Sequence, residues 1–234
     1  YYYIDRPLVF DTDVRDKVLN VRMRFDAASL MPELSTNGIY RNDEKLCYWI
    51  PEGYSENMKF YQESIVIYQY PQPDYWCWYG DEIIGFGLYD FALKLPPVPE
   101  GTYEIRYGYV PMAQRGITQI YVDDIPQGIP IDLTVNTYGT PSSPKIGWIA
   151  DTGDEEEDNK NDKAMHNRGY LKGPDSQCFT SARTLARSQH NLLRKIVATQ
   201  YLTPDVPHYI RFRSVTQNSL EFMLDYIELC PKSV

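Results

Sequence analysis

The sequence predicts a mainly β protein, folded as an antiparallel β-sandwich with a short helical segment near its N-terminus. Three observations lead to this fold class. Apolar and polar residues alternate in several short runs, Pro, Gly and Asn separate these runs, and no long helical patterns alternate with them. Alternation with a period of two is typical of half-buried strands, and strands without intervening helices favour antiparallel sheets over an α/β fold.

The first predicted element is a helix over residues 14–25. Its apolar stripe has helical spacing and consists of Val14, Val18, Val21 and Phe25. Asp11, Thr12 and Asp13 supply N-cap candidates, and Pro32 and the following Ser35–Gly38 end the helical region. We therefore assign residues 1–38 to an N-terminal strand and helical segment, and residues 39–234 to one sandwich domain.

The strand pattern begins at "GTYEIRYGYV" and returns in "IPIDLTV", "LLRKIVAT" and "YIRFRSV". The run "LEFMLDYIEL" follows the last of these after a short polar turn, which predicts a hairpin between the two. Eight inward-facing side chains are expected in one core: Tyr103, Ile105, Tyr107, Ile131, Leu133, Phe212, Phe222 and Leu224.

Two long stretches, at residues 139–163 and about 173–190, show no regular pattern and predict extended loops. The first contains the acidic run from Asp151 to Asp158. Carboxylates this dense suit either a hard cation or solvent, but the run lacks the fixed spacing of a calcium loop. We expect a solvated loop and no cofactor, with a structural calcium ion bound by this run as the alternative.

The net charge of −9 argues against nucleic-acid binding, which needs a dense basic face. Residues 163–213 nevertheless carry nine Lys or Arg against two Asp. We expect these cations to pair internally, with docking of an acidic partner as the alternative. No apolar run is long enough to span a membrane. Cys47 and Cys77 form either a disulfide or two buried free thiols.

The chain contains 21 tyrosines against 8 phenylalanines, and its densest aromatic run is "DYWCWYGDE". In a strand, Trp76 and Trp78 point to one side and Tyr75 and Tyr79 to the other. Such rings either pack under the predicted helix or form a surface on which sugar rings stack. The candidate ligand-binding set takes three of these rings, one neighbouring acid and two residues further along the chain: Tyr75, Trp76, Trp78, Asp81, Trp148 and Arg168.

The stretches from Leu95 to Leu133 and from His208 to Pro231 resemble the jelly roll of galactose-binding-like carbohydrate-binding modules, whose last strand carries a motif such as "LDYIEL". More narrowly, "YYYIDRPLVF" and "NDKAMHNRGYLKGP" are similar to the C-terminal region of fasciclin-domain-containing surface proteins of the Bacteroidetes. The body of a fasciclin repeat has no counterpart here, so no fasciclin function is carried over.

This resemblance implies a galactose-binding-like jelly roll in an exported, lipid-anchored cell-surface protein, anchored to the outer membrane. The expected function is non-catalytic binding of a glycan, or cell adhesion. A structural or protein-interaction domain without sugar binding is the alternative, and an enzyme acting on polysaccharide is disfavoured. His166, His190 and His208 follow no metal-ligand spacing, and the sequence has no nucleophile-elbow motif.

Overall fold

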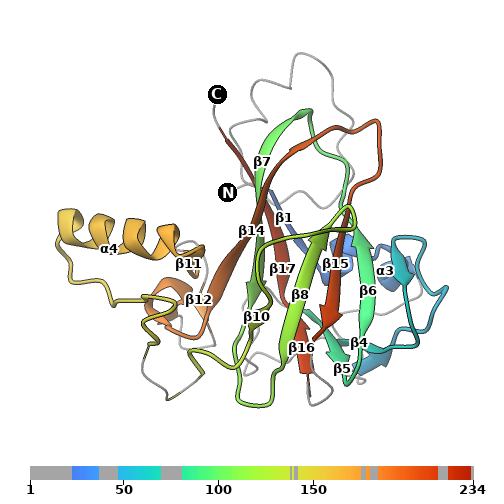
Figure 1. Cartoon of the computed structure of the whole chain (residues 1–234), viewed down its shortest axis with the longest axis horizontal. Helices are drawn as coiled ribbons and strands as arrows, with labels where there is room; N and C mark the ends of the chain where they lie inside the picture. The colour runs from blue at the N-terminus through green and yellow to red at the C-terminus, as the bar shows by residue number, and fades with distance from the viewer. Residues whose placement is uncertain are drawn as a thin grey trace.

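The computed structural model describes residues 23–36, 47–69, 81–137, 139, 142–174, 178–179, 184–215 and 221–232. Over this part of the chain the protein consists mainly of antiparallel strands arranged in packed sheets (Figure 1), which confirms the predicted mainly β sandwich. No helix in these ranges is long and apolar enough to cross a membrane.

The first sheet has five strands, and its central strand is the long Tyr-rich segment that the sequence pattern predicts. In sheet order the strands are β1 (Met23–Asp26), β17 (Tyr226–Pro231), β7 (Gly101–Tyr109), β14 (Leu193–Leu202) and β11 (Tyr170–Lys172). Residues near opposite ends of the sequence thus meet, because β1 pairs with β17.

The second sheet has six strands. In sheet order they are β10 (Ile131–Asp132), β8 (Ile117–Val122), β15 (Tyr209–Ser214), β6 (Asp90–Lys94) and β3 (Met58–Phe60), with β9 (Ile125–Pro126) paired to β8. A four-stranded sheet consists of β16 (Glu221–Leu224), β5 (Glu82–Phe86), β4 (Ile65–Gln69) and β2 (Cys47–Trp49). β12 (Cys178–Phe179) and β13 (Thr184–Leu185) form a separate pair.

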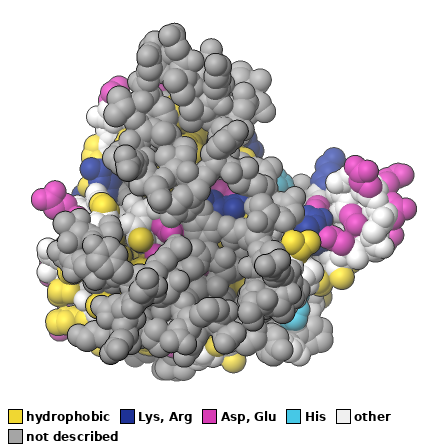
Figure 2. Space-filling view, turned by 180° about the vertical axis from the view of Figure 1, so that it is seen from behind, with side chains coloured by type: hydrophobic (Ala, Val, Ile, Leu, Met, Phe, Trp, Pro, Cys, Tyr) yellow, Lys and Arg dark blue, Asp and Glu magenta, His cyan; other side chains and the backbone are white. Residues whose placement is uncertain are grey.

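The described helices are short, with one exception. α2 (Ala27–Leu30), α3 (Glu33–Thr36) and the 3-10 helix η1 (Ala186–Ser188) each span about one turn. The longer helix α4 (Glu155–Asn167) projects from the sandwich at the left of Figure 1, and Met165 is its buried residue. Seen from behind in Figure 2, acidic side chains gather on this projecting helix.

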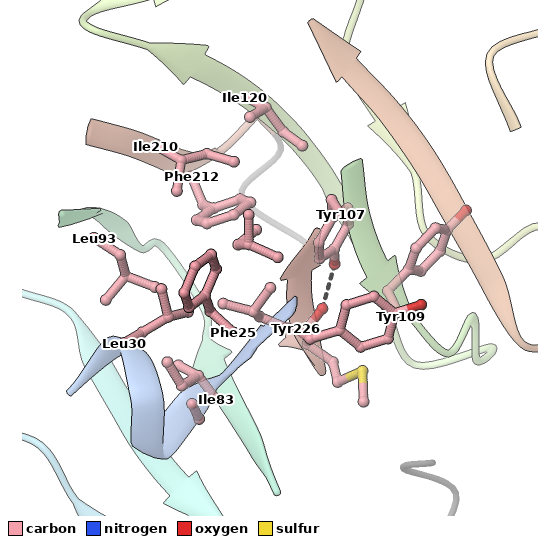
Figure 3. Close-up of a cluster of buried hydrophobic side chains, with 14 of the residues drawn as sticks. Phe25, Leu30, Ile83, Leu93, Tyr107, Tyr109, Ile120, Ile210, Phe212 and Tyr226 are labelled. Atoms are coloured by element: carbon pink, nitrogen blue, oxygen red, sulfur yellow. Dashed lines mark hydrogen bonds between the residues drawn. The ribbon is translucent and has the colours of Figure 1, made fainter. Parts of the chain in front are cut away.

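Side chains from all three large sheets meet in the core, among them Tyr107, Phe212 and Ile83 (Figure 3). The Tyr107 ring of the five-stranded sheet lies 5.5 Å from Phe212 of the six-stranded sheet and 5.8 Å from Phe222 of the four-stranded sheet. The Tyr107 hydroxyl also donates a hydrogen bond to the Met223 carbonyl. All eight side chains predicted for the core are buried: Tyr103, Ile105, Tyr107, Ile131, Leu133, Phe212, Phe222 and Leu224.

A row of buried ion pairs crosses the opposite face of the five-stranded sheet. The carboxylate of Glu228 accepts hydrogen bonds from Arg24 at 2.7 Å, Arg106 at 2.5 Å and Arg194 at 3.0 Å. Glu104 accepts a further bond from Arg106. The predicted alternation therefore holds in β7, but its polar side is buried as well.

The helix predicted over residues 14–25 is wrong at its C-terminal end. Residues 23–26 form β1, and the Phe25 side chain packs in the core. Pairing with β17 satisfies the backbone of this segment, which overrides its helical spacing. Val14, Val18 and Val21 lie outside the described residues, as does the predicted domain boundary at residue 38.

Two predictions about strands are also wrong. The strand expected over residues 129–135 is only two residues long, and Ile129 is 85% exposed. The expected hairpin does not form, because β15 pairs with β6 and β8. The run "LEFMLDYIEL" instead divides at the buried Asp225, whose backbone N–H donates to the Gly108 carbonyl, and its halves enter two different sheets.

The loop predicted over residues 139–163 contains the first part of α4. Asp154 caps this helix by accepting hydrogen bonds from the backbone of Glu156 at 3.0 Å and Glu157 at 3.1 Å. The acidic side chains in the first turn of α4 also stabilise the helix, because they lie at the positive end of its dipole. The loop expected near residues 173–190 contains η1 and the short β12 and β13.

Candidate functional site

The aromatic run at Tyr75, Trp76 and Trp78 lies outside the described residues. Asp81, which follows this run, is 1% exposed and lies beside α2. Its carboxylate accepts hydrogen bonds from the backbone N–H groups of Ala27 and Ala28, both at 3.0 Å, and from the Tyr68 hydroxyl. Asp81 thus connects α2 to β4.

Burial and the neighbouring Asp26 raise the pKa of Asp81 to about 8, although three hydrogen bonds oppose this shift. Burial also raises the pKa of Glu82 to about 7, with Arg115 opposing it. Both acids are located within the fold, in contrast to acids that surround an open sugar-binding surface.

Arg168 lies against Gly147, the residue that precedes Trp148. Trp148 is half-buried against the core, and its ring lies 5.8 Å from His190, edge to face. The exposed Arg168 side chain extends over Gly147, so a Cβ atom there would lie 3.1 Å from its Cδ atom. Arg168 also donates to the Ala164 carbonyl at the end of α4.

Four charged residues near Trp148 form a closed cluster that joins α4 to the sandwich. Asp151 accepts from Lys172 and from Arg187, both at 2.6 Å. Asp162 of α4 contacts the same two cations, at 3.0 and 2.7 Å. Burial opposes ionisation of Asp151, but the hydrogen bonds from Arg187 and Lys172 lower its pKa. Lys172 and Arg187 therefore pair internally, as the sequence predicts.

Three aspartates of the acidic run, Asp151, Asp154 and Asp158, are likewise engaged in protein contacts. Asp158 accepts from the backbone N–H groups of Thr152 and Gly153, and these bonds lower its pKa. Within the described ranges, no group of three or more His, Cys, Asp or Glu side chains is placed to hold a metal ion.

A different surface brings aromatic and charged side chains together. It is the outward face of the six-stranded sheet around β15, and we name it the tyrosine face. Its central residues are Lys59, Tyr61, Tyr121, Tyr209 and Arg211. Their alternation with buried residues leaves these side chains half-buried or exposed, while Ile210 and Phe212 point into the core.

Strand pairing places these residues side by side. Lys59 of β3 is opposite Ala92 of β6, Ala92 is opposite Arg211 of β15, and Arg211 is opposite Tyr121 of β8. Adjacent strands lie about 4.8 Å apart, so this row crosses four strands in about 15 Å. The row is long enough to contact several units of an extended ligand.

Arg211 holds the tyrosine rings in place. Its guanidinium carbon lies 3.7 Å from the centroid of the Tyr61 ring and 4.9 Å from that of Tyr121. The same group binds both carboxylate oxygens of Asp90, at 2.6 and 2.8 Å. Bidentate bonds and ring contacts of this kind fix a side chain in one orientation.

Two further contacts complete the tyrosine face. The Tyr61 hydroxyl donates to Asp124 at 2.9 Å, and burial together with Asp124 raises the pKa of Tyr61. The Lys59 ammonium lies 3.7 Å from the centroid of the Tyr209 ring. The result is a set of fixed aromatic rings with cations and carboxylates between them.

Sequence reasoning missed this face, although one signal for it was present. The alternation in "YIRFRSV" already places Tyr209, Arg211 and Arg213 on the side opposite Phe212. The pattern gives no information on which strands lie next to β15, so Tyr61 and Tyr121 could not be assigned to the same surface.

Comparisons with known proteins assign no family. No protein-family model matches the chain, and no curated protein matches it significantly. Among solved structures, it is similar to a Paenibacillus xanthan lyase, with 11% identity and a TM-score of 0.38 over 74% of this chain. The matched part is 12% of that much longer protein, and the similarity is too low to indicate fold or activity.

Proposed function

We propose that this protein is a non-catalytic glycan-binding module and that the tyrosine face binds the sugar. The observation that carries the proposal is the accessible arrangement of Tyr61, Tyr121 and Tyr209 around Arg211 on one sheet face. The apolar faces of sugar rings stack on aromatic rings, and their hydroxyl groups bond to charged side chains. Tyrosine offers both a flat ring and a polar hydroxyl.

The fixed geometry of this face favours binding. Ordering flexible side chains on association costs about 0.5–1.5 kcal/mol for each one. Here Arg211 is already bound to Asp90 and packed between two rings, so less of this cost remains to be met when a ligand arrives.

The contacts of the carboxylates support a binding role over a catalytic one. Asp90 is bound by Arg211, and Asp124 by Tyr61 and Arg211. Asp123 accepts from His208 and from the Tyr209 backbone. Because of the resemblance to surface proteins, we also propose that the protein is exported and anchored at the outer membrane. The ligand is then a glycan outside the cell.

The test is a glycan array followed by calorimetric titration of the purified chain. Replacement of Tyr121 or Tyr209 with Ala should weaken binding at least tenfold and leave the melting temperature nearly unchanged. Tyr201→Ala is the matched control, because Tyr201 is 55% exposed on the other large sheet. An equal loss of glycan affinity in Tyr201→Ala, or no glycan binding by the unaltered chain, would count against the proposal.

A second candidate is a protein-interaction domain, and an apolar surface favours it. On the four-stranded sheet, Trp49 is 67% exposed and Ile65 is 59% exposed, with Ile67 paired opposite Trp49. Exposed apolar patches often mark contacts with other proteins. If this candidate is correct, Trp49→Ala should abolish association with a partner protein, while the Tyr121 and Tyr209 variants should not.

A further inference from the structure

We infer that the tyrosine face binds an acidic polysaccharide whose charge comes from the carboxylates of uronic acids. This inference rests on the proposed function and adds the chemical class of the ligand. It comes from three cations that lie among or beside the tyrosine rings: Lys59, Lys94 and Arg213.

The three cations lie around the tyrosine rings on the same sheet face. Lys59 belongs to β3 and is exposed above the Tyr209 ring. Lys94 of β6 is directly opposite Tyr209 in the sheet. Arg213 is two residues beyond Arg211 on the same strand, so its side chain lies on the same face. All three therefore surround the surface on which a sugar would stack.

The charges of these three cations are largely available to a ligand. Among the described residues, Lys59 and Lys94 form no ion pair. Arg213 contacts Asp90 at 3.6 Å, but both oxygens of Asp90 already accept shorter bonds from Arg211. Since the Arg213 side chain is 54% exposed, most of its donors remain available to a ligand.

The carboxylates of the tyrosine face are already bound by neighbouring groups. Lys59, Lys94, Arg211 and Arg213 face three carboxylates, those of Asp90, Asp123 and Asp124. The carboxylates are bound to Arg211, His208, tyrosine or the backbone. Lys59, Lys94 and Arg213 therefore keep donors for a ligand on a chain whose net charge is −9, which favours an anionic ligand at this surface.

The geometry favours a carboxylate as the anion. The planar guanidinium of Arg213 matches both oxygens of a carboxylate, while the flexible lysines act as point charges. A uronic acid places a carboxylate on the edge of a sugar ring. Its ring can therefore contact the Tyr121 or Tyr209 side chain while the carboxylate reaches a neighbouring cation, such as the Lys59 ammonium over the Tyr209 ring.

The experiment compares three polymers by calorimetric titration of the whole chain: polygalacturonate, its fully methyl-esterified form and dextran sulfate. Esterification removes the charge but keeps the sugar rings. We expect polygalacturonate to bind at least tenfold more tightly than the ester at low salt, and added salt should reduce this preference.

Variants separate the contribution of charge from that of stacking. The double variant Lys59→Gln with Arg213→Gln should bind polygalacturonate no more tightly than the ester. Tyr209→Ala should weaken both. Melting temperatures provide the check on folding, and Lys145→Gln is a control at an exposed lysine away from this face.

Each contrary outcome has a distinct meaning. Equal affinity for polygalacturonate and its ester overturns the inference and leaves the proposed function intact. Preferential binding of dextran sulfate overturns the assignment of the anion to carboxylates. Failure to bind any glycan, on the array or in titration, overturns the proposed function and the inference together.

Discussion

Replacing Glu228 with Gln tests how far the buried ion pairs stabilise the five-stranded sheet. Burial opposes ionisation of Glu228, but Arg194, Arg24 and Arg106 together lower its pKa from 4.5 to about 2. Because one pKa unit corresponds to about 1.4 kcal/mol, the native state gains about 3 kcal/mol from this carboxylate. Glu228 is fully buried, so solvent screens little of this effect.

The substitution nearly preserves the side-chain volume but removes the negative charge that Arg24, Arg106 and Arg194 share. Leaving buried cations without their carboxylate typically costs about 3–5 kcal/mol. We therefore expect Glu228→Gln to lower the free energy of unfolding by about that amount at pH 7, measured by urea denaturation with tryptophan fluorescence. Glu52→Gln, at an exposed position, should have almost no effect.

The dependence on pH provides the decisive measurement. Because the folded-state pKa of Glu228 is depressed, its contribution is complete above about pH 4.5 and is lost as the pH falls toward 2. The difference in the free energy of unfolding between the unaltered protein and Glu228→Gln should therefore become smaller as the pH falls through that range. Equal stability at pH 7, or a difference that does not change in acid, would refute this reasoning.

Three further predictions concern the core and the buried acid. Phe212→Ala should cost about 3–5 kcal/mol in urea denaturation, since its ring contacts aromatic residues of two other sheets. Gly108→Ala should lower the melting temperature, because the new Cβ atom would lie 2.5 Å from the buried Tyr226 ring. The raised pKa of Asp81 has the opposite sign to that of Glu228, so its contribution to stability should fall as the pH rises from about 4 to about 8. Asp81→Asn should remove this part of the pH dependence, and an unchanged profile would contradict the assignment.

The core could be predicted because alternation shows which side chains share a face. Tyr103, Ile105 and Tyr107 follow one another at intervals of two, and a strand buries such a set together. Strand pairing could not be predicted in the same way. The neighbours of Phe212 in the sheet are Phe91 and Ile120, both far away along the chain.

The candidate site was harder to predict for the same reason. Arg168 lies against Gly147, next to Trp148 in the chain, although nothing in the sequence relates their positions. The tyrosine face depends on β3, β8 and β15, which only the folded sheet brings together. The dense aromatic run predicts a site at Trp76 and Trp78, whereas the tyrosines of the tyrosine face are far apart in the sequence.

The position of β17 has a consequence for how the chain folds. This strand lies between β1 and β7, although it follows every other described strand in the sequence. During synthesis, β1 therefore cannot pair with β17 until almost the whole described chain has emerged. Until then, one edge of β7 also has no partner strand. Open edges invite pairing with other chains. Fragments that stop short of residue 226 should therefore aggregate, and folding of the whole protein should be slow, as its long-range strand pairs require.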